Sequence, residues 1–512
     1  MSKNKKQALN SIMKGGAIVF LGTLASKFLG LLYLMLAGRL GVGDYGVISL
    51  MISVFSAVST VGYMGVHQGV QKYVAEYRGK GDWSKIRGTM ASGFQLIGLS
   101  SVITSLLLFM LAPFLANNLF NEPRALWPIR MVAIAIPFQA FTNVLNNYSE
   151  AMGDMKPTII TIQIFSNLVK IIAASSLVAL GFGYLGASFG FALAFILPTG
   201  LAYYFYTKKK TEKFEEATPR KNYSEIIQHS WPLFAAGILG VITGDIDTFM
   251  LQSLKGTTEV GFYNAAYPLG ALIVGFGGIF GNIFLSNSTE LLARDKKEAL
   301  TDVFGNTIKW INLLAVPIFL VVFAFPKSAL ILFGSEYFSA APVLRVISLG
   351  FLINSLLGPA GQVYQSYGKT KLNLYTTALL ATLNLILNYF LIKSYGTLGA
   401  AAATTLSFVV LFCAHYFLVK QFIDAKFFTF ETFKVWIAGL ISIGITYITS
   451  NILFGVVPRW FLIIDLIMFG VLYGSLLLVL DPFENQEREI LQEAGKKYGF
   501  KTERLEKLIA RN

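Results

Sequence analysis

The sequence predicts an all-α protein that crosses a membrane about fourteen times. Its 512 residues are 54% hydrophobic and only 14% charged, whereas soluble domains contain about 25% charged residues. Apolar stretches recur along the whole chain, and each is long enough to cross a hydrocarbon core about 30 Å thick. The basic residues lie almost entirely on one side of these stretches, as expected for a multi-pass membrane protein.

The predicted spans fall into three groups. The first six are 14–38, 46–70, 89–115, 126–151, 157–181 and 184–206. The next six are 228–252, 260–287, 302–325, 341–366, 372–394 and 397–419, and the last two are 435–456 and 460–480. The first stretch is too long for a signal peptide and leads directly into the second, so we expect it to be retained as a helix.

The positive charges predict the orientation of these spans. With the N-terminus in the cytoplasm, the cytoplasmic segments hold 31 Lys and Arg residues and the opposite segments hold six. This asymmetry follows the positive-inside rule, and it places both termini in the cytoplasm. The external loops are all short. The formal net charge of +14 is therefore a topological signal, and we do not expect a nucleic-acid partner.

Two six-helix groups repeat each other at a constant offset of 215 residues. The matched pairs are Asp44 with Glu259, Gly46 with Gly261, Arg130 with Arg345, Gly153 with Gly368 and Lys156 with Lys371. The motif Leu185-Gly186-Ala187 recurs as Leu398-Gly399-Ala400 at an offset of 213, which one small deletion explains. Because each group has an even number of spans, the two copies have the same orientation, and a pseudo-two-fold axis along the membrane normal would relate them. Such parallel repeats are typical of transporters.

The repeat predicts the domain organisation. It consists of an N-terminal six-helix lobe over 1–206, a basic cytoplasmic linker over 207–226, a C-terminal six-helix lobe over 227–421, two additional transmembrane helices over 422–480 and a cytoplasmic tail over 481–512. The tail has hydrophobic residues at partly helical spacing, which predicts a short amphipathic helix. A central cavity between two rocking lobes would allow alternating access.

Several enzyme classes lack the residues that they need. The single cysteine, Cys413, and three dispersed histidines cannot form a metal cluster, so we expect no metal and no cofactor. The string Gly368-Lys369-Thr370 lacks the earlier glycine of a P-loop and lies between two spans, which argues against an ATP site. No external loop is long enough for a polysaccharide polymerase or ligase. We therefore predict a protein that is not an enzyme.

The chain resembles the multidrug/oligosaccharidyl-lipid/polysaccharide exporter superfamily, and within it the prokaryotic polysaccharide biosynthesis branch of lipid-linked oligosaccharide flippases. The resemblance lies in Lys27–Gly46, Gly244–Leu251, Gly261–Asn264 and Gly368–Ala401. It implies twelve core helices in two bundles, two extra C-terminal helices and a place in the plasma membrane of a prokaryote. It also implies transport of a polyprenyl-diphosphate-linked oligosaccharide from the cytoplasmic to the outer leaflet. Membrane lipids and glycan biosynthesis enzymes are the further partners considered.

Ionisable residues within the predicted spans are the candidate functional residues, because a charge at membrane depth is costly unless it meets a partner or a wet cavity. Lys27 and Lys170 lie near the middle of spans one and five, where snorkelling is difficult. The repeat-related Arg130 and Arg345 lie about one turn inside the external face, where snorkelling is an alternative to a cavity.

Two acids, Asp245 and Asp247, lie in the outer half of span seven. Residues two apart do not share a helix face, so at most one of them can point at a given site. One is expected to pair with Lys27 or to bind a coupling cation, for which Na⁺ and H⁺ are the candidates. The alternative reading as a metal-binding pair of a sugar transferase lacks further acids or histidines nearby.

The hypothesis from the sequence is that Lys27 and Lys170, together with Arg130 and Arg345, line a cationic cavity for the diphosphate of a lipid-linked sugar. Lysine suits phosphate as a point charge and arginine as a bidentate fork. The alternative is a cation-coupled multidrug exporter of the same superfamily. That class should have an acidic cavity, whereas the deep residues here are mostly basic.

Overall fold

The computed structural model describes residues 22–275, 277–425, 427, 429–454 and 461–482. Within these residues all regular structure is helical and no strand occurs. Nine described helical runs are long and apolar enough to cross a membrane, and the shorter apolar helices Gly22–Gly38 and Ile464–Leu480 accompany them. The all-α multi-pass class is thus confirmed, while the count of fourteen spans stays a prediction. The start of the first predicted span and the predicted amphipathic tail lie outside the described residues.

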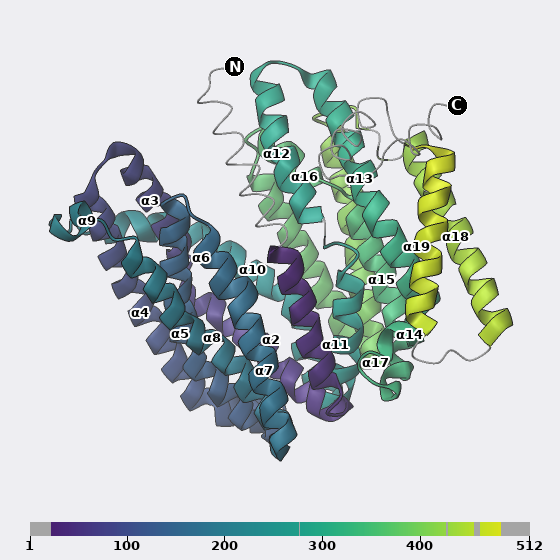
Figure 1. Cartoon of the computed structure of the whole chain (residues 1–512), viewed down its shortest axis with the longest axis horizontal. Coiled ribbons are helices and arrows are strands. Elements are labelled where there is room, and N and C mark those ends of the chain that lie inside the picture. Colours follow the sequence, from purple (N-terminus) through teal and green to yellow (C-terminus); the bar gives the residue numbers. More distant parts are fainter. Residues whose placement is uncertain (1–21, 276, 426, 428, 455–460, 483–512) are drawn as a thin grey trace. The chain divides into compact units, whose positions relative to one another are not determined.

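The chain forms two compact units, one made of the residues up to Ala265 with Asn384–Ala400 and the other made of the remainder. Figure 1 labels their helices. The first unit contains the helix Gly22–Gly38, α2 (Val42–Tyr63), α3 (Val66–Lys80), α4 (Trp83–Phe114), α5 (Leu126–Ala151), α6 (Lys156–Thr158), α7 (Ser166–Leu177), α8 (Gly183–Lys208), α9 (Glu212–Glu216) and α10 (Tyr223–Lys255). The second contains α12 (Gly277–Ala293), α13 (Lys297–Ala324), α14 (Pro326–Leu330), α15 (Ala341–Leu356), α16 (Ala360–Ser366), α18 (Phe430–Phe454) and α19 (Phe461–Leu480).

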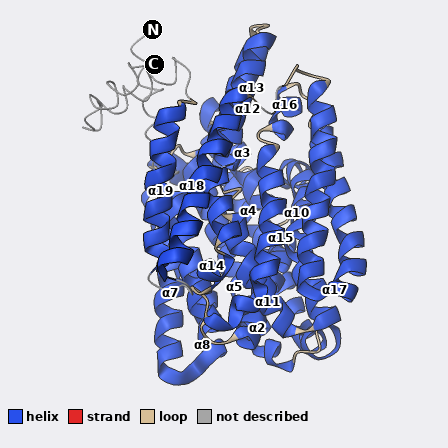
Figure 2. Cartoon of the chain, turned by 90° about the vertical axis from the view of Figure 1, so that its right-hand side faces the viewer, coloured by secondary structure: helices blue, strands red, loops and turns tan. Residues whose placement is uncertain are grey.

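Two helices, α11 (Thr257–Ala271) and α17 (Lys371–Lys420), pass from one unit into the other along the chain. The lobe boundaries predicted from the repeat, with a linker at 207–226, stay a prediction. Within the second unit, α18 and α19 run side by side, as Figures 1 and 2 both show, and α18 packs on α13.

Two predicted boundaries were wrong. The predicted span 46–70 ends at Tyr63, because Met64 and Gly65 adopt the left-handed conformation with φ of 47° and 67°. The polar stretch 71–88, which lies between the predicted spans 46–70 and 89–115, belongs to the amphipathic helix α3 and to the start of α4, whose N-cap Asp82 accepts a hydrogen bond from the Lys85 amide. The polar residues of this stretch indicated contact with solvent and not the absence of a helix, and Gly81, with φ of 70°, ends α3.

The predicted span 260–287 is also interrupted. It consists of α11 and α12, with turns at 272–275 between them. Gly275 and Gly277 border this break, and glycine is the residue type that helices least favour apart from proline. The apolar character of 260–287 predicted one continuous span because it does not reflect this weak helix propensity.

Each of two very long helical runs turns back on itself at a glycine. The runs Lys156–Lys208 and Lys371–Lys420 have 53 and 50 residues, which at about 1.5 Å per residue exceeds one crossing of the hydrocarbon. Gly183 (φ 50°, ψ −134°) and Gly396 (φ 57°, ψ −133°) have nearly the same non-helical conformation. After Gly183, α8 packs along α7, as the hairpin in Figure 2 shows.

The backbone conformation itself repeats along the chain. Positive-φ glycines recur in pairs, Gly41 with Gly256 (φ 105° and 93°), Gly153 with Gly368 (φ 83° and 74°) and Gly183 with Gly396 (φ 50° and 57°). The first two pairs have the offset of 215 and the third has the offset of 213. These conformations are sterically costly for residues that have a Cβ. The duplication inferred from side-chain matches therefore extends to the turns that the chain makes.

The first copy contains two π-helical segments that lie on either side of α7. They are Ile159–Phe165 and Val178–Phe182. A π turn joins residues five apart in place of four, and such segments often occur at functional sites. Lys170 lies on α7, between the two segments.

The N-terminal ends of α2 and α11 cross in a reciprocal contact within the first unit. A Cβ on Gly46 would lie 2.0 Å from the carbonyl oxygen of Thr257, and a Cβ on Gly261 would lie 2.2 Å from that of Val42. The offset of 215 relates Val42 to Thr257 and Gly46 to Gly261. In each copy the glycine therefore contacts the residue of the other copy that corresponds to the position four residues before it. Small residues at this spacing allow two helix backbones to approach closely.

We predict that Gly46→Ala and Gly261→Ala each lower the free energy of unfolding by about 1–3 kcal/mol, as overpacking does. The added methyl group would meet the backbone of the neighbouring helix, which cannot move aside as a flexible side chain can. Thermal unfolding of the detergent-solubilised protein measures this effect.

The matched control is Gly240→Ala in α10, because an added Cβ there meets nothing within 4 Å. That change should be neutral or stabilising by up to about 1 kcal/mol, since alanine has the higher helix propensity. Equal unfolding temperatures for Gly46→Ala, Gly261→Ala and Gly240→Ala would contradict a close packing role.

Candidate functional site

Lys170 lies on α7 between two aromatic rings of the first unit. Its Nζ is 5.6 Å from the ring centroid of Tyr33 and 5.3 Å from that of Phe191. It donates a hydrogen bond of 3.2 Å to Oδ1 of Asn167, one turn earlier. Among the described residues no carboxylate oxygen lies within 4.0 Å of this ammonium group. The aromatic faces and the amide stabilise the cation without neutralising it.

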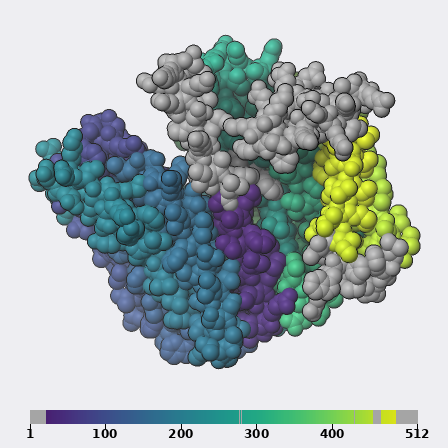
Figure 3. All heavy atoms as spheres, viewed as in Figure 1, coloured from purple at the N-terminus to yellow at the C-terminus, as the bar shows by residue number. Residues whose placement is uncertain are grey.

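The helix Gly22–Gly38 is joined to the same region by polar contacts. Asn167 donates from Nδ2 to Oγ of Ser26 at 3.0 Å, and the hydroxyl of Tyr33 donates to the carbonyl of Ala187 at 3.2 Å. Figure 3 shows this helix in purple beside the blue helices of the first unit. Lys27 follows Ser26 directly and is exposed on this helix. The amide of Asn167 thus lies between Lys170 and the turn that carries Lys27.

The two predicted arginines have other surroundings. The guanidinium carbon of Arg130 lies over the rings of Phe109 and Trp127, at 4.9 and 5.3 Å from their centroids. Nε of Arg130 is buried and has no hydrogen-bond partner in the described structure. Arg345 belongs to the second unit, is exposed, and donates from Nε to the carbonyl oxygen of Phe323.

The two aspartates of α10 face different neighbours, as their spacing requires. Asp245 accepts a hydrogen bond of 2.8 Å from the hydroxyl of Ser56 on α2. Asp247 is 2% exposed and accepts hydrogen bonds from the hydroxyl of Tyr263 and from Nδ2 of Asn388. Pairing of either aspartate with Lys27 stays a prediction.

Two asparagines that the sequence analysis did not single out complete the surroundings of Asp247. Asn384 and Asn388 lie one turn apart on α17, both are buried, and Nδ2 of Asn388 also donates to Oδ1 of Asn384 at 3.0 Å. Oδ1 of Asn388 is buried without a hydrogen-bond partner. Two amides four residues apart in an apolar span were a visible signal, but a search restricted to charged residues does not detect it.

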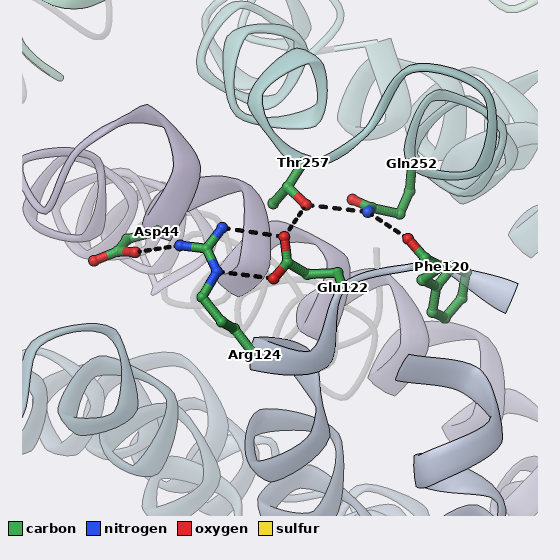
Figure 4. A network of polar contacts seen from close by, with 6 residues as sticks. All are labelled: Asp44, Phe120, Glu122, Arg124, Gln252 and Thr257. Carbon is green, nitrogen blue, oxygen red and sulfur yellow. Dashed lines mark hydrogen bonds and ion pairs between the residues drawn. The ribbon is translucent and has the colours of Figure 1, made fainter. Parts of the chain in front are cut away.

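A charged network connects the ends of several helices of the first unit (Figure 4). Arg124 donates to both carboxylate oxygens of Glu122, from Nε at 2.8 Å and from Nη2 at 3.1 Å, and from Nη1 to Asp44 at 3.0 Å. The guanidinium therefore bridges the loop after α4 and the first turn of α2. Asp44 was notable in the sequence for its match to Glu259, and its partner was not predicted.

The network continues from Glu122 to α10 and α11. Thr257 donates its hydroxyl to Glu122, and Gln252 donates from Nε2 to Thr257 and to the carbonyl of Phe120, at 3.0 and 2.9 Å. Burial alone would raise the pKa of Glu122, but the hydrogen bonds from Arg124 and Thr257 outweigh burial and hold this pKa below its usual value. The repeat-related Glu259 accepts from the backbone and side chain of Thr397, beside Gly396.

Comparison with known protein families identifies the family of this chain. The profile described as "Polysaccharide biosynthesis protein" matches residues 12–282, which is more than half of the chain. The chain belongs to this family. A second family profile, described as MatE, matches residues 232–390 of this chain.

Individual relatives cover most of the chain. It is 24% identical over 468 residues to the "Probable low-salt glycan biosynthesis flippase Agl15" of Haloferax volcanii, with 89% of this chain and 93% of the relative covered. It is 22% identical over 454 residues to the "Lipid II flippase MurJ" of Bacillus subtilis, with 80% and 83% covered.

A solved structure has the same fold. The structure titled "Lipid II flippase MurJ, inward closed conformation" matches with a TM-score of 0.70 at 17% identity and covers 90% of this chain and 98% of that one. The superfamily and the fold class predicted from the sequence are confirmed. The chain is a multi-pass membrane protein with a membrane transporter fold.

We predict that Glu122→Gln lowers the free energy of unfolding at neutral pH by about 1–2 kcal/mol, because it removes the charged acceptor of the half-exposed Arg124 and the buried Thr257. The depressed pKa of Glu122 means that its contribution is complete above the ordinary carboxyl pKa of about 4.3 and is lost as pH falls below that value. Thermal unfolding from pH 7 down to acid pH measures both effects.

The variant should therefore lose less stability than the native protein over the acid part of this range. Glu336→Gln, at an exposed acid of the second unit, is the matched control and should follow the native profile. Parallel acid profiles for the native protein and Glu122→Gln would show that the network does not stabilise the charged carboxylate.

Proposed function

We propose that this protein is a transporter that moves a polyprenyl-diphosphate-linked oligosaccharide from the cytoplasmic to the outer leaflet by alternating access. The observation that carries the proposal is Lys170, an ammonium group within a span that no described carboxylate neutralises. A cation in this position favours an anionic ligand, because a ligand phosphate would supply the missing charge. Relatives whose names include glycan biosynthesis flippase and lipid II flippase support the same reaction.

Lys27 is proposed to act with Lys170 on the phosphate groups. Ser26 and Asn167 join the two elements that carry these lysines, so the amide of Asn167 links the site to the first helix. Arg130 and Arg345 are proposed as further basic groups along the substrate route. Arg130 lies over two aromatic rings and Arg345 donates from Nε to one carbonyl oxygen, so other N–H groups of each guanidinium can bind a phosphate.

The driving force proposed is an ion gradient or the membrane potential. A potential of 100 mV is worth about 2.3 kcal/mol for each charge that crosses. If basic groups only partly neutralise the diphosphate, an inside-negative potential favours its outward movement. This proposal places the protein in the plasma membrane of a prokaryote, with both termini in the cytoplasm, where glycan biosynthesis enzymes would supply the substrate.

The site for a coupling cation is proposed at Asp247. Its carboxylate, the carbonyl oxygen of Asn384 and the orphaned Oδ1 of Asn388 form a buried set of oxygen ligands with one negative charge. Oxygen ligands suit hard cations, and a single carboxylate suits a monovalent ion. Na⁺ fits this set, and H⁺ would instead bind to the carboxylate. Asp245, which accepts a hydrogen bond from Ser56 of α2, is proposed to assist from the neighbouring turn.

The alternative is a cation-coupled multidrug exporter, which the MatE match to residues 232–390 makes relevant. An exporter of cationic drugs requires an acidic site for the drug. In the first unit the candidate acid Asp247 accepts hydrogen bonds from Tyr263 and Asn388. The two aromatic rings of Tyr33 and Phe191 surround a lysine, Lys170, and not an acid. This arrangement supports an anionic substrate.

We predict that Lys170→Gln and Lys27→Gln each abolish transport while the protein still inserts into the membrane. The first removes the unneutralised charge, and the second removes its neighbour on the adjoining helix. Leaflet access of the lipid-linked sugar in cells that depend on the variant measures transport, and protein abundance in the membrane fraction measures insertion.

Lys170→Arg should retain part of the activity, because it keeps the charge. Lys393→Gln, at an exposed position of α17, is the matched control and should transport normally. Full transport by Lys170→Gln would refute the proposed role of the cation, and an unchanged leaflet distribution in cells that lack the protein would refute flipping.

We predict that Na⁺ stabilises the purified protein and that Asp247→Asn removes this stabilisation. A ligand present well above its dissociation constant raises the free energy of unfolding by about 1–3 kcal/mol. Thermal unfolding in sodium chloride and in choline chloride of equal ionic strength measures the gain.

Asp302→Asn makes the same chemical change at an exposed position of α13 and should keep the full gain. A native protein that responds to pH and not to Na⁺ would identify H⁺ as the coupling ion. A full sodium-dependent gain in Asp247→Asn would exclude this carboxylate as the cation site.

A further inference from the structure

A polar cavity of about 310 Å³ lies between α4, the end of α8 and the short helix α9. The distribution of basic residues places this end of the helices in the cytoplasm. The basic side chains of Arg87 and Lys210 line the cavity, with Glu215 as the acidic group that faces them. The remaining wall is apolar and mainly aromatic, formed by Met90, Ala91, Phe94, Tyr206 and Phe214.

The wall formed by α9 is fixed to α4. Arg87 donates from Nη1 to the carbonyl oxygens of Glu215 and Ala217, and the amide of Arg220 donates to the carbonyl of Ser84 at 3.0 Å. Phe214 is buried against Tyr206 in the core of the first unit. The cavity is therefore built by the fold and is not an open space under a free linker.

The basic groups of the cavity keep hydrogen-bond donors available. Arginine has five N–H donors. Both hydrogen bonds of Arg87 within the described residues use Nη1, so Nε and Nη2 remain available to a ligand. Nζ of Lys210 lies 4.8 Å from the ring centroid of Tyr206. In the described structure neither group has a carboxylate oxygen within 4.0 Å, although Glu215 lines the same cavity. Two cations and one anion leave the lining with a net positive charge.

The level of the cavity in the membrane points to a lipid as the source of the anion. Tyr203 and Tyr204 lie in the last two turns of α8, shortly before Lys210, and are 57% and 48% exposed. Exposed tyrosines at the end of a spanning helix are typical of the headgroup region. Nζ of Lys208 lies 4.6 Å from the ring centroid of Tyr204, so the end of the helix carries further positive charge. Basic pockets at this level bind anionic headgroups.

We propose that this cavity binds the phosphate of an anionic membrane phospholipid in the cytoplasmic leaflet. Arg87 contacts the phosphate through Nε and Nη2, and Lys210 contacts it as a point charge. Because Arg87 also holds the carbonyls of Glu215 and Ala217, the bound lipid braces α9 against α4. This site is separate from Lys170 and Asp247, and its test does not depend on transport.

The test compares the full-length protein in nanodiscs of pure phosphatidylcholine with nanodiscs that contain phosphatidylglycerol. Hydrogen exchange of the backbone amides of 211–217 reports whether the lipid braces α9, and native mass spectrometry counts the retained lipid. We expect phosphatidylglycerol to slow exchange in 211–217 and to be retained in preference to phosphatidylcholine. Lys210→Gln should weaken retention about fivefold, as expected for one basic contact, and should remove the slowing.

The other variants separate binding from folding. Glu215→Gln should strengthen retention, because it removes the acidic group of the cavity while the carbonyl contact of this residue remains. Lys213→Gln changes a base of the same helix that does not line the cavity, and it should behave as the native protein does. Arg87→Gln should lose both retention and part of the exchange protection even in phosphatidylcholine, because the same side chain holds α9.

Three results would overturn the proposal. The first is equal amide exchange of 211–217 in both lipids. The second is a response of Lys210→Gln to phosphatidylglycerol that equals the response of the native protein. The third is a loss of lipid retention in Lys213→Gln as large as the loss in Lys210→Gln. Soluble glycerol phosphate is the probe for a free anion. If it slows exchange of 211–217 in phosphatidylcholine nanodiscs as strongly as phosphatidylglycerol does, the occupant is a soluble phosphate and the lipid assignment is wrong.

Discussion

The inability of hydrocarbon to solvate polar groups is the constraint on which the rest of this structure depends. Backbone groups at membrane depth must be bonded within helices, so the long runs reverse at glycines such as Gly183 and Gly396 with few residues outside the helix. Side-chain charges obey the same constraint. Arg124 is bonded to two carboxylates, and Asp247 is bonded to a tyrosine and an asparagine. Against this background Lys170, whose ammonium group contacts one amide and two rings and no carboxylate among the described residues, is the candidate functional cation.

The sequence predicted the features that depend on composition and period. Apolar length predicted the helices, basic residues predicted their orientation, and matched positions predicted a duplication that also appears in the conformations of Gly41 and Gly256. Features that depend on individual contacts could not be predicted. The helix α3 is polar because one of its faces is solvated, and Asn384 and Asn388 carry no charge to mark them. The neighbours of Lys170 come from separate helices whose packing no local pattern specifies.

The first unit holds intramembrane groups of both signs, and each has its own neighbours. The basic group lies on α7 with the helix Gly22–Gly38, and the acidic group lies on α10 with α11 and α17. The network of Arg124 and Glu122 joins α2, α10 and α11 at their ends, beside the close crossing at Gly46. A change in the charge of Asp247 therefore affects α10 and α11, which the network of Arg124 and Glu122 also joins.

The two π segments beside α7 fit the change of offset within the repeat. A π turn accommodates one residue more than an α turn, so two such segments absorb the two residues by which the offset falls from 215 to 213 between Gly153 and Gly183. Counting one extra residue after the first segment makes Lys170 equivalent to Asn384. The corresponding positions of the two copies then carry a cation in the first and a neutral amide beside Asp247 in the second. Insertions within a helix, which rotate every later side chain, would have provided the asymmetry that a duplicated protein needs before its halves can bind different ligands.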